Sequence, residues 1–460
     1  MYIKDNYMVD NRICASANKN IIPELSATLG AAYGTFLKNR GVVVLARDYR
    51  ADSRMLKRSF ASGLMSAGVN VLDIHAGSSC ILRFTIRRFG ASGGVMFTAG
   101  HAYSGETLIK FYDAHGIEYG QKFFHKIFDI INQNKIVRVS PTEIGQISTA
   151  EDININTIYN KSMRQFIDKN VLSKSNLRVV MDCANGPVGI IAPPLFSSLD
   201  IDVIAINTFI PDRNIQLLPN INSIRKISRI ISSADADFGV AYDVDASKAL
   251  FFDETGTVID SDMLIMLFFM DLINKNIKNP IVITSQTTTR MLDELAKEYN
   301  VKLIRVENIP GHVSNMIRLK MANLGVSDGG KIRFPMYAPF TDTILVALKL
   351  CEMLAYTGEK LSNLIAQCPQ PIRMQEDVVV DKEVFYNYHL YLNSLKKDVK
   401  KIIDILFGVK IFFDEDTGFI TVTPQLYFDR LRLSAELKDG INANSLFEMV
   451  KKALKIKMIN

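Results

Sequence analysis

The sequence predicts an α/β protein assembled from several layered units with largely parallel sheets. Three stretches, residues 41–97, 177–206 and 281–306, alternate runs of Val, Ile and Leu with apolar residues at helical spacing. Strand, helix and strand joined by short connections are typical of βαβ units, whose strands lie parallel. Residues 377–423 have a different pattern of β runs around one helix, which predicts a smaller α+β unit.

The composition of each segment justifies the individual elements, because β-branched residues favour strands and apolar residues at intervals of three and four favour helices. Strands are expected at 41–46, 69–74, 94–97, 177–182, 202–206, 281–284, 302–306, 377–380, 409–413 and 418–423. Helices are expected at 53–68, 80–89 and 291–299, with further helices after 186 and after 380. Residues 414–418 (DEDTG) predict a hairpin turn.

Segments rich in Pro, Ser, Asn and Gln predict the boundaries between units. They lie near 145–155, 257–262 and 366–374, and Pro369-Gln370-Pro371 is the clearest of them. The sequence therefore predicts three α/β units of related pattern and one α+β unit. Their expected bounds are 1–150, 151–258, 259–371 and 372–460.

Composition excludes several classes of protein. Of the 460 residues, 48% are hydrophobic and 22% are charged, as in ordinary globular proteins rather than disordered or fibrous ones. The longest apolar run, 263–270, is far shorter than the roughly 20 residues that cross a bilayer. The first ten residues, MYIKDNYMVD, do not have the pattern of a signal peptide. We therefore expect no membrane association.

Charge and cysteine content suggest partners and a compartment. The 54 Lys and Arg against 48 Asp and Glu give a net charge of +6, a mild excess that would suit an anionic small molecule. Lysines concentrate in 396–401 and 451–457, where interleaved apolar residues favour solvated helix faces over a nucleic-acid patch. The five cysteines form no CxxC motif, which suggests reduced thiols in a cytoplasm.

A search for nucleotide, metalloprotease, EF-hand and nucleophile-elbow motifs finds none. Three polar or Gly-rich turns follow predicted strands instead: 98–104, 243–248 and 325–331. Asp243 and Asp245 alternate along the second turn, so both carboxylates could face one Mg²⁺ ion, although two exposed loop aspartates remain an alternative. His101 could act as an acid, a base or a phosphate donor, or could be structural.

Taken in order, these segments resemble the α-D-phosphohexomutase superfamily, which includes phosphomannomutase, phosphoglucomutase and phosphoglucosamine mutase. Residues 43–50 (VVLARDYR) resemble the family's V-V-x-G-R-D-x-R. Residues 93–99 (GGVMFTA) resemble the approach to its active-site loop, and Ile109-Lys110-Phe111 follows that loop. Residues 182–186 and 337–350 resemble segments of the second and third domains, so the resemblance covers nearly the whole chain.

The resemblance implies a fold and an activity. The fold is four domains around a central cleft: three similar α/β domains with mixed sheets and a smaller C-terminal α+β domain. The activity is an intramolecular phosphotransfer, in which a phosphoserine donates its phosphoryl group to a hexose phosphate with the help of Mg²⁺. Four loops carry this chemistry in the family, and each of the four departs from the family pattern in this chain.

In the first loop, the family's T-A-S-H-N-P places its nucleophilic serine where this chain has Gly100. His101 is retained, and the resemblance also assigns Lys110 to the catalytic site. Glycine has no side chain that could accept a phosphoryl group. Ser104, four residues later, is a possible substitute acceptor.

In the metal loop, D-G-D-A-D-R becomes Asp243-Val-Asp245-Ala-Ser247-Lys248, which predicts weak or lost Mg²⁺ binding. In the sugar loop, G-E-x-S-G-H becomes 326–331, where the resemblance assigns substrate contacts to Ser327, Asp328 and Lys331, together with Lys248 of the metal loop. The family's phosphate clamp corresponds to 423–429 (TPQLYFD), in which no side chain would cradle a phosphate.

We therefore expect a phosphohexomutase-like pseudoenzyme that acts by binding a ligand or a protein partner. Two alternatives remain open. One is an active mutase with a substitute acceptor, for which Ser104, His101 and Ser247 are candidates. The other is a different activity on an anionic ligand in the same cleft. The sugar phosphate or other anion, the Mg²⁺ ion and the protein partner all remain predictions at this point.

Overall fold

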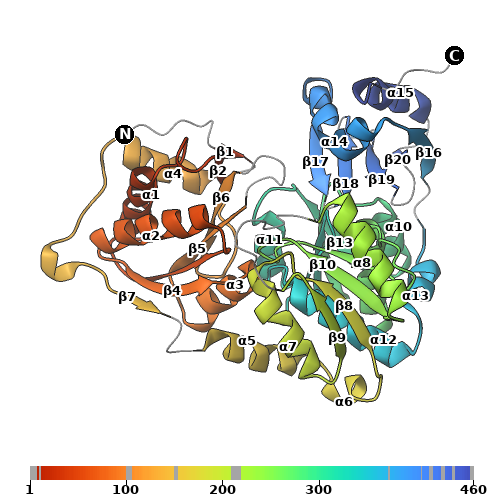
Figure 1. Cartoon of the computed structure of the whole chain (residues 1–460), viewed down its shortest axis with the longest axis horizontal. Coiled ribbons are helices and arrows are strands. Elements are labelled where there is room, and N and C mark those ends of the chain that lie inside the picture. Colours follow the sequence, from red (N-terminus) through yellow and green to blue (C-terminus); the bar gives the residue numbers. More distant parts are fainter. Residues whose placement is uncertain are drawn as a thin grey trace.

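The computed structural model describes residues 8–9, 12–99, 106–149, 154–208, 219–370, 373–405, 407–413, 418–425, 430–437 and 441–455. Within these residues the strands form four sheets, which define domains I to IV in chain order. Domain I lies at the left of Figure 1, domains II and III lie together at the lower right, and domain IV lies above them. The predicted boundaries at residues 150 and 371 lie outside the described residues.

Domain I has helices on both faces of a seven-stranded sheet. Its strands are β1 (Met8–Val9), β2 (Arg12–Ala15), β3 (Val42–Arg47), β4 (Asn70–Ala76), β5 (Gly93–Ala99), β6 (Thr107–Asp113) and β7 (Ile147–Thr149). Its helices are α1 (Pro23–Phe36), α2 (Ala51–Ser66), α3 (Ser79–Arg88) and α4 (Gln121–Asn132). Side chains alternate along β3: Val43 packs in the core with α1, α2 and α4, whereas Val44 packs in the core with α3.

Domains II and III each have a four-stranded sheet. The strands of domain II are β8 (Arg178–Asp182), β9 (Asp202–Ile206), β10 (Phe238–Tyr242) and β11 (Ala249–Phe252). Those of domain III are β12 (Ile281–Ser285), β13 (Lys302–Val306), β14 (Leu324–Ser327) and β15 (Lys331–Arg333). The helices from residue 155 to residue 367 are α5 (Ile155–Met163), α6 (Lys169–Leu172), α7 (Ala192–Ser197), α8 (Ile221–Ser233), α9 (Ser261–Asn274), α10 (Met291–Glu298), α11 (His312–Lys320), α12 (Thr343–Thr357) and α13 (Leu361–Gln367).

The first three domains share one topology. In each, three parallel strands lie in the order second, first, third, and a fourth strand pairs antiparallel with the third. The fourth strands are β6, β11 and β15. The sheets are therefore mixed. The alternation of strands and helices along the sequence does not reveal the antiparallel strand, because only a few residues separate it from the third strand.

A three-residue motif marks the same point in each of these domains. It is Ile-x4-Ala-x2-Gly, with the isoleucine at the end of a helix and the glycine in the third strand. A Cβ atom on the glycine would lie 2.1–2.6 Å from the isoleucine Cδ1, so only glycine lets the helix approach the strand this closely. The pairs are Ile86 with Gly94, Ile231 with Gly239 and Ile317 with Gly325.

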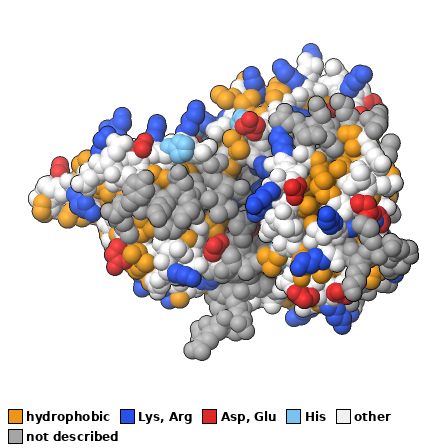
Figure 2. Space-filling view, turned by 90° about the horizontal axis from the view of Figure 1, so that it is seen from above, with side chains coloured by type: hydrophobic (Ala, Val, Ile, Leu, Met, Phe, Trp, Pro, Cys, Tyr) orange, Lys and Arg blue, Asp and Glu red, His pale blue; other side chains and the backbone are white. Residues whose placement is uncertain are grey.

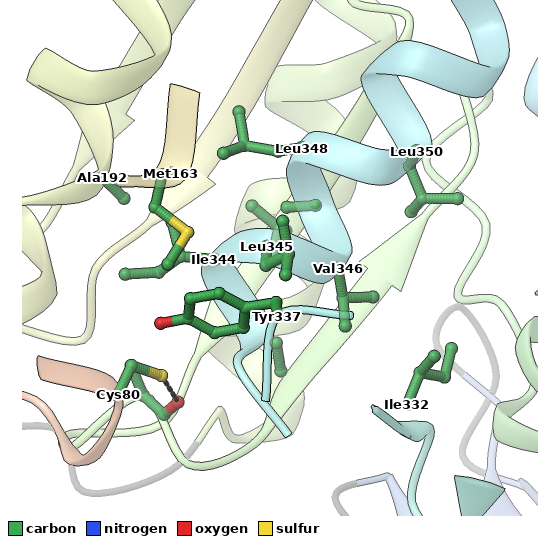
Figure 3. Close-up of a cluster of buried hydrophobic side chains, with 14 of the residues drawn as sticks. Cys80, Met163, Ala192, Ile332, Tyr337, Ile344, Leu345, Val346, Leu348 and Leu350 are labelled. Atoms are coloured by element: carbon green, nitrogen blue, oxygen red, sulfur yellow. Dashed lines mark hydrogen bonds between the residues drawn. The ribbon is translucent and has the colours of Figure 1, made fainter. Parts of the chain in front are cut away.

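One buried hydrophobic core joins domains I, II and III. It contains residues of α3, α5, α7, α9 and α12. Figure 3 shows Ile344 and Leu345 of α12 beside Met163 of α5 and near Tyr337. In the same region Cys80 Sγ of α3 lies 3.9 Å from the Thr343 hydroxyl. This shared packing fixes the relative positions of the three loops described below.

Domain IV has a separate core between a five-stranded antiparallel sheet and two helices. Its strands are β16 (Met374–Val379), β17 (Lys401–Ile405), β18 (Gly408–Phe412), β19 (Gly418–Pro424) and β20 (Arg430–Leu437), and its helices are α14 (Lys382–Leu392) and α15 (Ala443–Ala453). β18 and β19 pair antiparallel, with Phe412 opposite Phe419. Of the turn predicted at 414–418, residues 414–417 lie outside the described residues and Gly418 begins β19.

Among the described residues, no helix has both the length and the apolar character needed to span a bilayer. On the face that Figure 2 presents, lysine and arginine side chains are scattered and acidic side chains lie among them.

Candidate functional site

The three turns that the sequence singles out occupy equivalent positions in the three repeats. Each connects the third strand of its domain to the antiparallel fourth strand, at the carboxyl end of the parallel strands. In domain I, β5 and β6 pair as far as Ala99 and Thr107. Gly100, His101 and Ser104 come between these strands in the sequence and are outside the described residues. Because β5 ends at Ala99, Gly100 is the next residue in the chain. Their roles stay predictions.

In the β10–β11 loop, the backbone and side chain of Ser247 link the two aspartates. The Ser247 hydroxyl donates to Asp243 Oδ2 at 3.0 Å, and its backbone N–H donates to Asp245 Oδ1 at 3.2 Å. The backbone N–H of Lys248 donates to Asp243 Oδ1 at 3.0 Å. Both aspartates are buried. The structure therefore brings together the residues predicted to hold a metal ion.

Domain I contributes two side chains to the same cluster. Lys110 Nζ of β6 donates to Asp245 Oδ2 at 2.7 Å and to the Ser247 hydroxyl at 3.1 Å. The hydroxyl of Ser79, at the start of α3, donates to Asp245 Oδ2 at 2.6 Å. The cluster thus bridges domains I and II, and Lys110 is the cation that faces its carboxylates most closely.

The charges of this cluster are interdependent. Burial alone would raise the pKa of Asp245, but the Lys110 ammonium and the hydrogen bonds hold it well below its usual range. Burial alone would lower the pKa of Lys110, but Asp245 outweighs burial and raises it. Burial and the charge of Asp245 raise the pKa of Asp243 to about 7. Lys110 thus neutralises the carboxylate of Asp245, whereas the carboxylate of Asp243 lacks a full countercharge.

The donor set of this loop fits Mg²⁺ in kind. Mg²⁺ prefers oxygen ligands and commonly takes one or two carboxylates with water or phosphate. Asp243 and Asp245 supply the carboxylates and Ser247 supplies a hydroxyl, and the raised pKa of Asp243 indicates missing positive charge. These three residues are the ones that would hold the ion. No third carboxylate joins them, since the described residues contain no group of three or more His, Cys, Asp or Glu suited to a metal.

Cationic side chains crowd the neighbouring part of the site. Lys331 is half-buried on β15, and burial lowers its pKa to about 7. The positive charges of Lys248, Arg12 and Arg333 contribute to this low value. Burial also lowers the pKa of Arg333 to about 9, with the charge of Arg83 adding to the effect. An anionic ligand would relieve this repulsion, because it would supply the negative charge that the cluster lacks.

The sugar loop places its predicted contacts in different environments. The buried hydroxyl of Ser327 accepts a hydrogen bond from Arg333 Nη1 at 3.1 Å. Asp328 Oδ2 accepts from Ser285 Oγ at 3.0 Å, from Asn308 Nδ2 at 3.2 Å and from the Thr287 hydroxyl. Its Oδ1 accepts from Lys410 Nζ of domain IV at 3.2 Å. Asp328 is therefore held by protein groups, and its contact with a substrate stays a prediction.

Lys410 belongs to a buried ionic network between domains III and IV. Its Nζ lies 3.1 Å from Asp262 Oδ2 and donates to the Thr287 carbonyl at 2.9 Å. Arg373 joins Asp262 at 2.6 Å to Glu436 at 3.2 Å. Lys410 and Asp262 are both 2% exposed. Each buried charge would be costly without an opposite charge beside it, so the pair stabilises both. The network links the start of α9 and the sugar loop to β18 and β20.

A cavity of about 450 Å³ opens between the sugar loop and domain IV. Its lining includes Gly329, Gly330 and residues 423–425, the start of the predicted phosphate clamp, together with residues 249–251 and 255–258 of domain II. Arg432 also lines it, but it pairs with Asp377 at 2.7 and 2.9 Å. Residues 426–429 lie outside the described residues. The described clamp residues are thus a threonine, a proline and a glutamine rather than cations.

Sequence reasoning missed four residues of this region: Ser79, Arg12, Arg333 and Lys410. Ser79 follows a parallel strand, β4, so it lies at the same carboxyl edge of the sheet as the first of the three loops. Arg333 lies two residues after Lys331 on β15 and so shares its face of the strand. Nothing in the local sequence marks Lys410, which reaches the site from another domain.

Comparison with known proteins places the chain in a family. Residues 11–138, 157–256 and 260–372 match the sequence patterns described as "Phosphoglucomutase/phosphomannomutase, alpha/beta/alpha" domains I, II and III. A phosphoglucomutase/phosphomannomutase of Thermococcus kodakarensis is 28% identical over 443 residues, which cover 94% of this chain and 95% of that protein. A probable phosphoglucosamine mutase of Methanobrevibacter smithii is 29% identical over 449 residues, with 95% and 96% covered.

The fold agrees with solved structures. A phosphoglucomutase/phosphomannomutase family protein of Burkholderia thailandensis superposes with a TM-score of 0.74 at 18% identity, covering 99% of each chain. The four-domain architecture, the order of the domains and the positions of the loops within the repeats therefore follow one established plan. This chain belongs to the phosphoglucomutase/phosphomannomutase family of the α-D-phosphohexomutase superfamily.

Proposed function

We propose that this chain binds a hexose phosphate, or a similar anionic ligand, in the cleft between its domains but does not transfer a phosphoryl group. Gly100 carries this proposal. It directly follows β5, where the family pattern places its nucleophilic serine, and it has no side chain to accept a phosphoryl group. The protein would then act as a pseudoenzyme whose ligand binding or partner binding has a regulatory role.

The aspartate loop supports the proposal. Two carboxylates and a hydroxyl would hold Mg²⁺ more weakly than three carboxylates, and Lys110 already neutralises Asp245. When bound, the ion would supply positive charge beside a transferring phosphate. We therefore propose that Mg²⁺ binding is weak.

The cations of the cleft support an anionic ligand. Lys331, Lys248 and Arg333 each have a lowered pKa, because burial and neighbouring positive charges disfavour their charged forms. The relatives named as hexose-phosphate mutases make a sugar phosphate the first ligand to test. We propose a cytoplasmic location, since the five cysteines are all buried thiols and form no CxxC motif.

A coupled mutase assay tests the proposal. The full chain is incubated with glucose 1-phosphate or mannose 1-phosphate, Mg²⁺ and the matching sugar bisphosphate as primer, and hexose 6-phosphate is measured. We expect no turnover above the blank, but saturable binding of the hexose phosphate by calorimetry. A rate within about a hundredfold of an ordinary mutase would overturn the proposal, since loss of a nucleophile costs on the order of 10⁶ in kcat in one studied hydrolase.

Protein-bound phosphate separates this proposal from an active mutase with a substitute acceptor. After incubation with a labelled sugar bisphosphate, we expect no acid-stable or base-stable label on the chain. If label does appear, Ser104→Ala, His101→Ala and Ser247→Ala identify its position, because only the variant that lacks the acceptor would lose it. A chain that binds no hexose phosphate and carries no label would favour another anionic ligand.

A further inference from the structure

A groove at the junction of domains I and III combines exposed methionines with basic side chains. Its volume is about 480 Å³. Met321 and Met336 form part of its lining, although 86% and 90% of their surfaces are exposed. Arg87 of α3, Arg318 of α11 and His115 line the same groove. None of its nine lining residues is acidic.

Met321 is an unusual side chain for the backbone conformation that it adopts. Met321 ends α11 in the left-handed region, with φ 50° and ψ 47°. This conformation is unfavourable for most side chains but is open to glycine and tolerated by aspartate. Position 321 is the fourth after Ile317 of the repeated motif, and the equivalent positions in domains I and II are Gly90 (φ 60°) and Asp235 (φ 48°). Domain III alone has an apolar side chain there.

Burial does not explain this methionine either. A side chain that is 86% exposed contributes little to the core. Leu319, two residues earlier on α11, is 74% exposed. Met321 and Met336 line one groove together with basic residues, and exposed apolar side chains gathered in this way are typical of interaction surfaces on soluble proteins. Strain kept at an exposed position also suggests that the side chain has a function.

We propose that this groove docks an acidic segment of a partner protein, which inserts an apolar side chain between Met321 and Met336. Flexible methionine side chains adapt to different apolar anchors, and Arg87 and Arg318 would pair with carboxylates on either side of the anchor. The groove lies on the domain I–III junction and is lined by none of the loop residues of the cleft. The inference therefore stands whether or not the chain is an active mutase.

A random 12-residue peptide library displayed on phage provides the probe. The full chain is the bait, and peptides that survive selection are synthesised for fluorescence anisotropy. We expect the enriched peptides to carry Asp or Glu around a Leu, Met or Phe, and to bind less tightly as salt concentration rises. Met336→Ala and Arg318→Glu are each expected to weaken binding at least tenfold. Met374→Ala, which shortens an exposed methionine of domain IV, is the matched control and should leave affinity unchanged.

Met321→Gly distinguishes a docking anchor from a structural residue. It installs the residue found at the equivalent position of domain I, so we expect the melting temperature to rise because the strain is released, while peptide affinity falls at least tenfold. A lower melting temperature would show that Met321 serves stability and would overturn the proposal. A library that yields no enriched peptide would also overturn the proposal. So would peptides that bind Met336→Ala, Arg318→Glu and Met321→Gly as tightly as the natural chain.

Sedimentation of the free chain tests whether a second copy of the chain occupies the groove. We expect a monomer at micromolar concentration, unchanged by Met321→Gly. A dimer that this variant dissolves would assign the groove to a second copy of the chain and would also overturn the proposal.

Discussion

At the residue scale, Ser247 stands between two buried aspartates that it bonds through both its hydroxyl and its backbone N–H. It thereby satisfies oxygen atoms that would otherwise face a cation. A carboxylate at this position would add a negative charge and a ligand oxygen, whereas serine adds only a neutral donor. The affinity of the loop for Mg²⁺ should therefore depend on this one side chain.

Ser247→Asp is expected to tighten Mg²⁺ binding by about tenfold or more, because it restores a third carboxylate to the loop. Calorimetric titration with Mg²⁺, or electron paramagnetic resonance with Mn²⁺, measures the change. Adding Asp243→Asn to Ser247→Asp should reverse the gain, since it removes an original ligand. Equal metal affinity in the natural chain and in Ser247→Asp would contradict the metal assignment.

Lys331 makes anion binding dependent on pH. Its pKa is about 7, so the protonated fraction falls roughly tenfold between pH 6 and pH 8. We expect sulfate, whose own charge is constant over this range, to bind more weakly as pH rises, followed by thermal shift. Lys331→Met should remove most of this dependence, and Lys302→Met, on an exposed lysine of the same domain, should not. A sulfate affinity that is flat with pH in the natural chain would refute the prediction.

The same lysine affects stability without a ligand, with the opposite sign. The folded pKa is about 7 and the ordinary value is 10.5, so between these values the unfolded chain binds more protons than the folded one. Below pH 7 the folded chain bears the full cost of holding a charged Lys331. As pH rises from 7 to 10.5 this cost disappears, so the free energy of unfolding increases.

At the element scale, the three repeats each depend on a glycine in the third strand facing an isoleucine of the preceding helix. In domain II a Cβ on Gly239 would lie 2.2 Å from Ile231 Cδ1 and 2.8 Å from its Cγ1. The isoleucine end can shift, but a branched side chain needs more room than such a shift provides.

Gly239→Val is expected to lower the free energy of unfolding by about 1–3 kcal/mol through overpacking. Ile231→Ala alone should also destabilise, because it leaves a cavity. The double variant should lose less than the sum of the two, since each change relieves the other. Urea denaturation measures all three. Additive losses would show that the helix and strand do not meet at this pair.

The same element explains part of what sequence inspection missed. The antiparallel fourth strands of domains II and III are short: β11 has four residues and β15 has three. A strand this short has no alternating pattern long enough to recognise. The three loops were found because strong strands precede them, but their equivalence appears only once the fourth strand is seen to pair with the third.

At the scale of the whole molecule, domain IV is joined to domain III by buried charges. Lys410 approaches Asp262 and Asp328 and lies 3.8 Å from the centroid of the Phe419 ring. Removing the lysine would take the paired cation from the buried Asp328 and would leave Asp262 with Arg373 alone. Breaking a buried pair in this way is far more costly than losing a pair on the surface.

Lys410→Met is expected to destabilise the chain by about 3–5 kcal/mol in urea denaturation. Lys451→Met is the control: it breaks a lysine pair with Glu376 and Glu448 inside domain IV, whose carboxylates are partly exposed, and should cost only about 0–1 kcal/mol. Hydrogen exchange should also speed up at residues 324–333 in the first variant and not in the second. Unchanged exchange there would show that Lys410 does not hold the sugar loop.

The sequence by itself determined the layered α/β architecture, the β runs of domain IV and the positions of three loops after strong strands, because local composition and spacing control these features. Gly100 is also a fact of sequence, since the identity of the residue after β5 needs no coordinates. Tertiary structure decided what the loops contact. Lys110 reaches Asp245 across 135 positions and Lys410 reaches Asp328 across 82, and no local pattern records such partners. Contacts between residues so distant in sequence depend on how domains pack, which only the folded chain establishes.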